Sequence, residues 1–228
     1  MHFLISIITY LLPLFYSTTY TTSEEAPTYI HQKFKKHSAN ELYDLHIEYP
    51  YFLIDNENKS HKLNLSIQSI MTSALKDFQH QHKKRSKKVN QNGFSYFNLS
   101  YEVVYLSESI LSLKFINTLF YHGEASEKEK VSTLNFDLKN NKILKIKSIF
   151  DIETDNLRSS ILSLIMEKSS CYCNRYSVYK QFCIAKEGIY FYGDDYSCPE
   201  NCSTVTTFLS WSDLEDFSLN PLFAQHLL

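Results

Sequence analysis

The chain has 228 residues, a formal net charge of −2, and 43% hydrophobic and 15% aromatic residues. This composition can bury a core, which excludes an intrinsically disordered chain. The near-neutral charge lacks the strongly basic face of a nucleic-acid-binding protein, so no nucleic-acid partner is expected. The length suits one domain, or one domain built from two subdomains.

An apolar run near the N-terminus predicts a signal peptide over residues 1–23. Residues 3–16 read FLISIITYLLPLFY without a charge. Crossing a bilayer takes about 20 apolar residues, so the run suits a cleaved leader better than an anchor, with an uncleaved interfacial helix as the alternative. Cleavage is expected after Ser17 or near Ser23. The sequence therefore predicts a secreted or periplasmic protein with no stable membrane span after signal removal.

A first α+β subdomain is predicted over residues 41–106, after a polar lead-in over 24–40. Leu45, Ile47 and Tyr49 alternate with polar residues, as in a half-buried strand that Pro50 interrupts. A helix over about 62–80 is then predicted from apolar residues at steps of three and four, namely Leu63, Ile67, Ile70, Met71, Ala74 and Phe78.

The basic run that follows this helix, from His82 to Lys88, has two interpretations. The favoured one is a solvated loop whose cations complement the negative end of the helix dipole. The alternative is a patch for anionic cell-wall polymer or phospholipid.

A second subdomain is predicted over residues 107–228. The runs 94–106 and 110–121 are strand-like and predict a hairpin between the two halves. Further elements are expected as a strand around Leu134–Leu138, a helix starting at Asp151 or Asp155, a hairpin over 182–192, a strand over 204–211 and a turn or short helix to Phe217. The predicted fold class is α+β, with two β-rich subdomains, each an antiparallel sheet packed with one principal helix.

Five cysteines lie in one stretch of the second subdomain: Cys171, Cys173, Cys183, Cys198 and Cys202. In an exported protein such clustering predicts disulfides, with one thiol left over. Cys198 is expected near Cys202, and Cys183 near Cys171 or Cys173. A zinc site is the alternative, but the spacings are loose and no histidine lies within the cluster, so no metal is predicted.

No motif of catalysis or cofactor binding is present in the sequence. G-x-S-x-G, H-E-x-x-H, a P-loop and a dinucleotide fingerprint are all absent, so neither a catalytic residue nor a cofactor is predicted. Asp194 and Asp195 could act as paired carboxylates, but a polar turn beside Tyr196 is the simpler interpretation.

The order of several short motifs resembles a pair of extracellular domains. Tyr49-Pro50, the helix and the strand that follows resemble the first half of the pair. SLKFINTLFYHGEAS (112–126), STLNFDLKNNKILKIKSIFD (132–151) and the hairpin FCIAKEGIYFY (182–192) resemble its second half. The pair is found in the anti-sigma factor RsiV and in the N-terminal part of the peptidoglycan deacetylase PdaC, and the resemblance covers about residues 40–218.

The departures from the family pattern limit what the resemblance implies. Glu124 and Ser126 stand where the family has a second glycine and a histidine, and a loop from Tyr196 to Cys202 replaces its Tyr- and Pro-rich loop. Neither a cytoplasmic sigma-binding segment nor a deacetylase domain accompanies the module, so neither activity is expected. What the resemblance implies is an α+β envelope domain, which in the RsiV branch binds lysozyme.

The sequence therefore predicts an exported binding or sensing module that is not an enzyme, with a protein such as lysozyme, or peptidoglycan, as its partner. Binding residues concentrate on loops held by a rigid scaffold. The candidate binding residues, all in or beside two such loops, are Tyr121, His122, Tyr192, Asp194, Asp195 and Tyr196, with Trp211 as a further aromatic. The alternative is an envelope hydrolase, which would need a carboxylate or histidine with a shifted pKa in a cleft.

Overall fold

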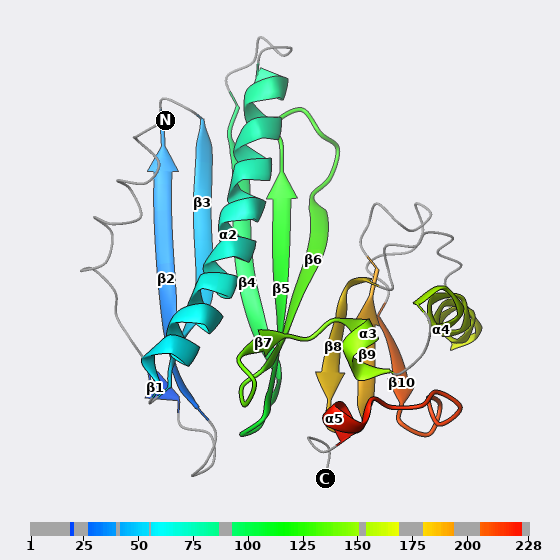
Figure 1. Ribbon diagram of the computed structural model, residues 1–228. Helices are drawn as coiled ribbons and strands as arrows, with labels where there is room; N and C mark the ends of the chain where they lie inside the picture. Colours follow the sequence, from blue (N-terminus) through cyan, green and yellow to red (C-terminus); the bar gives the residue numbers. More distant parts are fainter. Residues whose placement is uncertain are drawn as a thin grey trace.

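The computed structural model describes residues 19–20, 27–39, 42–54, 56–86, 93–150, 154–168, 180–193 and 206–224. Within these ranges the chain forms a large and a small β-sheet with helices packed on them (Figure 1). The strands are β1 (Thr19–Tyr20), β2 (Thr28–Ser38), β3 (Tyr43–Leu53), β4 (Ser95–Leu106), β5 (Ile110–Phe120), β6 (Lys128–Asp137), β7 (Lys142–Ile143), β8 (Phe182–Ala185), β9 (Gly188–Tyr192) and β10 (Thr206–Ser210). The helices are α2 (Glu57–Ser86), α3 (Ile146–Ile149), α4 (Thr154–Lys168) and α5 (Pro221–Ala224).

The large sheet has seven strands in the order β1 to β7. All of its pairs are antiparallel except β3 with β4, which are parallel. A parallel pair needs a crossover connection, and α2 provides it by running diagonally across one face of the sheet (Figure 1). The predicted α+β fold, with two sheets and a principal helix on each, is confirmed. The large sheet is mixed, however, rather than purely antiparallel.

Helix α2 covers the large sheet because its apolar residues recur every three or four positions. Leu63, Ile67 and Phe78 are at most 1% exposed and belong to the main core cluster. The helix predicted over 62–80 is therefore confirmed, and it extends to Glu57 and Ser86. The basic run that was predicted to be a loop after the helix lies inside α2 as far as Ser86. Its Lys83, Lys84 and Arg85 occupy the last turn, where cations complement the negative end of the helix dipole.

The small sheet has the order β10-β9-β8 and packs against the large sheet through β8. Strand β8 contacts β4, β5 and β6. It lies on the face of the large sheet away from α2, because Ser112, which bonds to Asn135 beside β8, alternates along β5 with Leu111 and Leu113, which belong to the core cluster under the helix. Helix α4 packs on β10 and buries Ile161 and Ile165 in a second core cluster. The predicted hairpin over 182–192 and the strand over 204–211 are confirmed as β8–β9 and β10.

Side chains of β6 complete the hydrogen bonds of β8, which lies at the edge of its own sheet. The Asn135 amide nitrogen donates to the carbonyl oxygen of Phe182 at 2.7 Å, and its Oδ1 accepts from the backbone nitrogen of Ile184 at 3.0 Å. The same Oδ1 accepts from the Ser112 hydroxyl at 2.7 Å, and the backbone nitrogen of Phe182 donates to the Thr133 hydroxyl at 3.2 Å. Asn135 therefore replaces a peptide group and joins the two sheets.

The predicted lead-in over 24–40 contains β2, which the sequence analysis missed. Strand β2 pairs with β3 along its whole length, from Thr28 opposite Leu53 to Ser38 opposite Tyr43. Its sequence, TYIHQKFKKHS, lacks a clean apolar alternation and therefore resembles a polar surface segment. Its lysines suit a strand near the edge of a sheet, where charge prevents pairing with other chains.

Pro50 does not interrupt β3, contrary to the prediction. The strand continues to Leu53, although proline has no backbone N–H to donate. The pairing of β3 with β4 ends at Ile47, opposite Leu99, so Pro50 lies where no donor toward β4 is needed.

The predicted subdomain boundary between residues 106 and 107 falls inside the β4–β5 hairpin. These two strands are paired from Tyr96 opposite Phe120 to Leu106 opposite Leu111. The large sheet thus continues across that point and ends with β7, after which the chain passes to α3, α4 and the small sheet.

Within the described ranges, no helix is both long enough and apolar enough to span a membrane. The predicted signal peptide lies outside these ranges except for Thr19 and Tyr20, which pair with β2 as β1. Cleavage after Ser17 would keep this pair, whereas cleavage near Ser23 would remove it.

Candidate functional site

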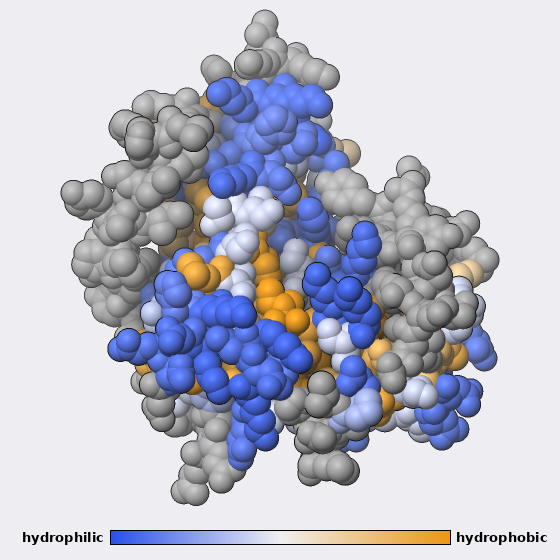
Figure 2. Space-filling view, in the orientation of Figure 1, coloured by the Kyte–Doolittle hydropathy of each residue, from blue (hydrophilic) through white to orange (hydrophobic). Residues whose placement is uncertain are grey.

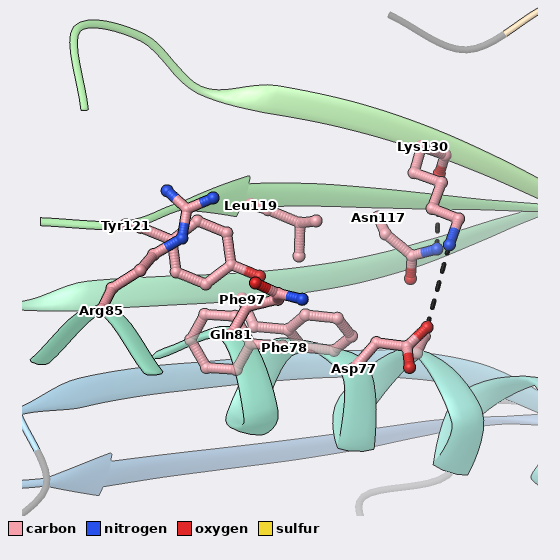
Figure 3. Close-up of a pocket in the computed structure, with 10 residues that line it drawn as sticks. Asp77, Phe78, Gln81, Arg85, Phe97, Asn117, Leu119, Tyr121 and Lys130 are labelled. Carbon is pink, nitrogen blue, oxygen red and sulfur yellow. Dashed lines mark hydrogen bonds and ion pairs between the residues drawn. The ribbon is translucent and has the colours of Figure 1, made fainter. Parts of the chain in front are cut away.

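A groove of about 560 Å³ lies between the C-terminal half of α2 and strands β5 and β6 (Figure 3). It is lined by Ala74, Asp77, Phe78, Gln81, Arg85, Phe97, Asn117, Leu119, Tyr121 and Lys130. Figure 2, in the orientation of Figure 1, shows an apolar strip in the middle of this side of the molecule, between hydrophilic surfaces.

The local structure brings these side chains into one groove. On α2, positions 74, 77, 78, 81 and 85 recur at the helical spacing and so share one face. On β5 and just beyond it, Asn117, Leu119 and Tyr121 are alternate residues and point to the same side of the sheet. Lys130 lies opposite Asn117 in β6 and extends this wall.

One end of the groove is aromatic and holds a paired cation. Tyr121 is 3% exposed, and its ring stacks on Phe78 with centroids 5.4 Å apart. The Arg85 guanidinium lies over the other face, 4.3 Å from the Tyr121 ring centroid, in a cation–π contact. Arg85 also forms an ion pair with Glu124, which Lys128 contacts at 3.0 Å. These contacts hold the α2 C-terminus against the turn after β5.

The middle of the groove contains a buried side-chain amide whose nitrogen has a hydrogen-bond partner and whose oxygen has none. Asn117 is 1% exposed, and its Nδ2 donates to the carbonyl oxygen of Lys130 at 3.3 Å. Its Oδ1 has no hydrogen-bond partner and points toward α2 in the close-up (Figure 3). A buried carbonyl oxygen without a partner is rare in folded proteins, because burial removes its bonds to water.

The charges that line the groove are paired within the protein. Lys130 Nζ lies 3.9 Å from Asp77 Oδ2, across the opening between β6 and α2 (Figure 3). Arg85 pairs with Glu124, as described above. The groove therefore offers apolar walls and a free hydrogen-bond acceptor rather than a net charge.

Comparison with known proteins gives a partial match that includes most of this groove. Residues 36–127 match the family model described as Deacetylase PdaC. This segment is similar to that family and is called the PdaC-like domain. It runs from the end of β2 to the turn after β5, and so it contains both the helix wall and the β5 wall of the groove.

Two solved structures share the fold beyond the PdaC-like domain. A member of the DUF3298 family from Bacteroides fragilis is similar with a TM-score of 0.63 and 15% sequence identity, over 86% of this chain and 96% of that chain. A DUF3298 family protein from Pseudomonas aeruginosa is similar with a TM-score of 0.54 and 10% identity, over 92% of this chain and 96% of that chain. At these identities the likeness shows a common fold. No curated protein matches the sequence.

One of the predicted binding residues lies at the aromatic end of the groove, and a second follows it in the chain. Tyr121 lines the groove itself. His122 follows it, and its backbone nitrogen donates to the Ser95 hydroxyl at 3.1 Å. The His122 ring lies so close to Gly93 that a Cβ there would be 2.0 Å from it, so any other residue at position 93 would require the ring to move.

The other predicted binding residues do not join this groove. Tyr192 is 5% exposed, outside the PdaC-like domain, in a small cluster between the sheets with Cys183 and Val131. Asp194, Asp195 and Tyr196 lie outside the described residues. Trp211, half-buried, donates from its indole nitrogen to the Lys186 carbonyl oxygen at 2.9 Å.

Sequence reasoning missed the residue that gives the groove its polar centre. Asn117 interrupts an otherwise apolar alternation on β5, from Leu111 through Leu113 and Phe115 to Leu119. A polar residue on a strand face that otherwise builds the core is a signal that the sequence did carry. The helix wall was missed because Asp77, Gln81 and Arg85 look like ordinary surface residues of an amphipathic helix.

Cys183, a predicted disulfide candidate, is a free and fully buried thiol, contrary to the suggested pairing with Cys171 or Cys173. Its Sγ donates to the Leu113 carbonyl oxygen at 3.4 Å, inside the contact between the two sheets. The other four cysteines lie outside the described residues. Among the residues that the structure does describe, no group of three or more His, Cys, Asp or Glu side chains could hold a metal ion.

Cys183 is expected to resist alkylation in the native protein and to react after unfolding. Burial raises the pKa of the Cys183 thiol well above its ordinary value, and the thiolate is the reactive form. Iodoacetamide labelling with and without urea, followed by mass spectrometry of the tryptic peptide 181–186, measures this directly because the peptide contains no other cysteine. Equal labelling in both conditions would contradict the buried position.

Proposed function

We propose that this chain is an exported cell-envelope binding module, without catalysis of its own, that recognises lysozyme or cell-wall glycan. The observation that carries the proposal is the groove beside α2, where the buried Asn117 oxygen lacks a partner. Ligand sites are concave and mostly apolar, with a few polar groups that fix orientation. This groove has that composition, and the PdaC-like match includes two of its walls.

Export is part of the proposal and rests on the sequence. The uncharged run over residues 3–16 suits a secretory leader, and clustered cysteines suit an oxidising compartment. N-terminal sequencing of the protein recovered outside the cytoplasm tests it. A new N-terminus at residues 18–24 supports export, whereas an intact Met1 in the cytoplasmic fraction contradicts it.

Lysozyme is a candidate ligand because the motif order resembles the extracellular domains of RsiV. The candidate surface is the turn from Tyr121 to Ser126, which projects beyond β5 at the end of the groove. Its Glu124 is held by Arg85 and Lys128, so the turn is fixed before any partner arrives. A preorganised surface binds with a smaller ordering cost.

The deciding experiment uses residues 18–228, which keep every described element, folded under oxidising conditions. Calorimetric titration with lysozyme and co-sedimentation with insoluble peptidoglycan are run in parallel. Saturable binding in either arm supports a binding module, and inhibition of lysozyme would add an inhibitory role. Absence of binding in both arms would refute the proposal.

The variant His122→Ala separates recognition from folding at the turn. Loss of lysozyme binding with an unchanged unfolding temperature would place His122 at the contact surface. Equal loss of binding and of thermal stability would instead show that His122 only supports the fold, through its packing on Gly93. Phe94→Ala is the control, because it removes another aromatic ring next to Gly93, and that ring is 41% exposed. It shows whether the loss of any exposed ring near the turn weakens binding.

A further inference from the structure

We propose that the groove beside α2 binds a neutral saccharide unit, with Asn117 Oδ1 accepting a hydrogen bond from a hydroxyl or acetamido N–H of the sugar. This inference rests on the proposed binding function and names its site and ligand class. Three independent features carry it: the unpaired acceptor, the paired charges and the apolar walls.

The unpaired acceptor implies a donor that comes from outside the chain. Asn117 is 1% exposed, and its Nδ2 already bonds to Lys130, so the side chain is anchored with Oδ1 turned into the groove (Figure 3). Its neighbours on the same strand face, Phe115 and Leu119, are apolar core residues. An apolar residue at position 117 would fit the core better, because an unsatisfied buried carbonyl oxygen destabilises the fold. Residues that break a folding rule in this way are expected at functional sites.

The paired charges select a neutral ligand. Lys130 is engaged with Asp77, and Arg85 with Glu124 and with the Tyr121 ring. A phosphate or nucleotide would have to compete with these carboxylates for the cations. A metal ion would find two amide oxygens, from Asn117 and Gln81, and the Asp77 carboxylate, which already has a cationic partner. These are too few ligands for a metal ion.

The walls match the two faces of a sugar ring. Phe78, Phe97 and Leu119 provide apolar surface for C–H groups, while Gln81 and Asp77 bring polar atoms to the rim. The volume of about 560 Å³ falls within the range of small-ligand sites, about 300–1,000 Å³. A pyranose carries hydroxyls at its edge and C–H groups on its faces, so it can satisfy Asn117 and the apolar walls together.

The test measures binding of N,N′-diacetylchitobiose and cellobiose to residues 18–228 by calorimetry and by NMR chemical-shift changes. Asn117→Leu removes the acceptor while keeping the branched heavy-atom skeleton, and it is expected to weaken binding roughly tenfold or more. The same variant should unfold at nearly the native temperature, because removal of the unsatisfied oxygen offsets the loss of the Nδ2 bond to the Lys130 carbonyl oxygen. Thr118→Val is the matched control, since it replaces the next polar side chain of β5, on the opposite face of the sheet.

A second variant, Gln81→Ala, keeps the test possible if Asn117→Leu fails to fold. Gln81 is exposed on α2, so its replacement should not disturb folding. It should also weaken sugar binding, at unchanged unfolding temperature. Binding of diacetylchitobiose alone would identify an acetamido ligand, and binding of both probes would identify a hydroxyl donor. Either result supports the proposal if Asn117→Leu lowers the binding or, where that variant does not fold, if Gln81→Ala lowers it.

The outcomes separate this inference from the proposed function. Sugar binding that both variants leave unchanged would place the site elsewhere and overturn the inference. Absence of sugar binding, with lysozyme or peptidoglycan still bound, would also overturn the inference but leave the binding module intact. Absence of binding to sugar, lysozyme and peptidoglycan alike would refute both.

Discussion

Replacing Asn135 with leucine is expected to lower the free energy of unfolding by about 3–5 kcal/mol, because three buried groups would lose their partner at once. These are the Phe182 carbonyl oxygen, the Ile184 backbone N–H and the Ser112 hydroxyl. Asn135 is 3% exposed, so water has little access to replace the lost bonds. Leucine has the same branched heavy-atom skeleton as asparagine, so the substitution leaves no cavity.

Urea unfolding followed by the fluorescence of Trp211, the single tryptophan, measures this loss. Trp211 packs on the core cluster of the small sheet and so reports on the part that Asn135 joins to the large sheet. The matched control is Asn98→Leu, at an exposed position on β4, which should stay within about 0.5 kcal/mol of the native protein. A similarly small change for Asn135→Leu would show that the two sheets are held together by apolar packing alone.

An intermediate effect is expected from the neighbouring hydroxyl. Thr133→Val removes the acceptor for the Phe182 backbone nitrogen but leaves the Asn135 bonds intact. Loss of this bond, and of the Thr133 hydroxyl bond to Gln181 Oε1 at 3.2 Å, predicts a smaller change, about 1–2 kcal/mol. The ranking of the two variants therefore tests whether the side chains of β6 act as the missing strand beside β8.

Elements with strong local periodicity could be predicted from the sequence. Helix α2 was found from apolar residues such as Leu63, Ile67 and Phe78, and the β4–β5 and β8–β9 hairpins from their runs and turns. Strand β2 was missed because its stability comes from pairing with β3 rather than from its own pattern. The parallel pairing of β3 with β4 is likewise a consequence of where α2 crosses, which no local pattern encodes.

The candidate site was predictable only in part, for the same reason. Tyr121 and His122 were chosen from their position in a turn. The structure places Tyr121 in the lining of the groove, whereas His122 follows it and bonds through its backbone nitrogen to Ser95. The groove itself depends on the diagonal path of α2, which sets Gln81 and Arg85 opposite β5. Asn117 was visible as a polar residue within an apolar alternation, but its unpaired oxygen follows from burial in three dimensions.

Replacing Phe78 with alanine is expected to destabilise the protein by about 3–5 kcal/mol, as is typical of a phenylalanine removed from a core. Phe78 is 1% exposed, and its ring lies within 6 Å, centroid to centroid, of four others: Tyr43 at 5.8 Å, His82 at 5.9 Å, Phe97 at 5.4 Å and Tyr121 at 5.4 Å. These contacts attach the last turns of α2 to the large sheet. The loss therefore includes ring contacts as well as buried area.

Far-UV circular dichroism during urea unfolding measures the effect on the large sheet and α2. Leu65→Ala is the matched control on the same helix, because Leu65 is 48% exposed and its removal should change stability by less than about 0.5 kcal/mol. Since Phe78 also forms a wall of the groove and supports the ring of Tyr121, its loss should weaken ligand binding together with stability. That joint loss is opposite to the behaviour expected of Asn117→Leu, which should lose binding without losing stability. If Phe78→Ala were as stable as the Leu65→Ala control, α2 would not depend on this ring cluster, and the groove that it lines could not be a rigid site.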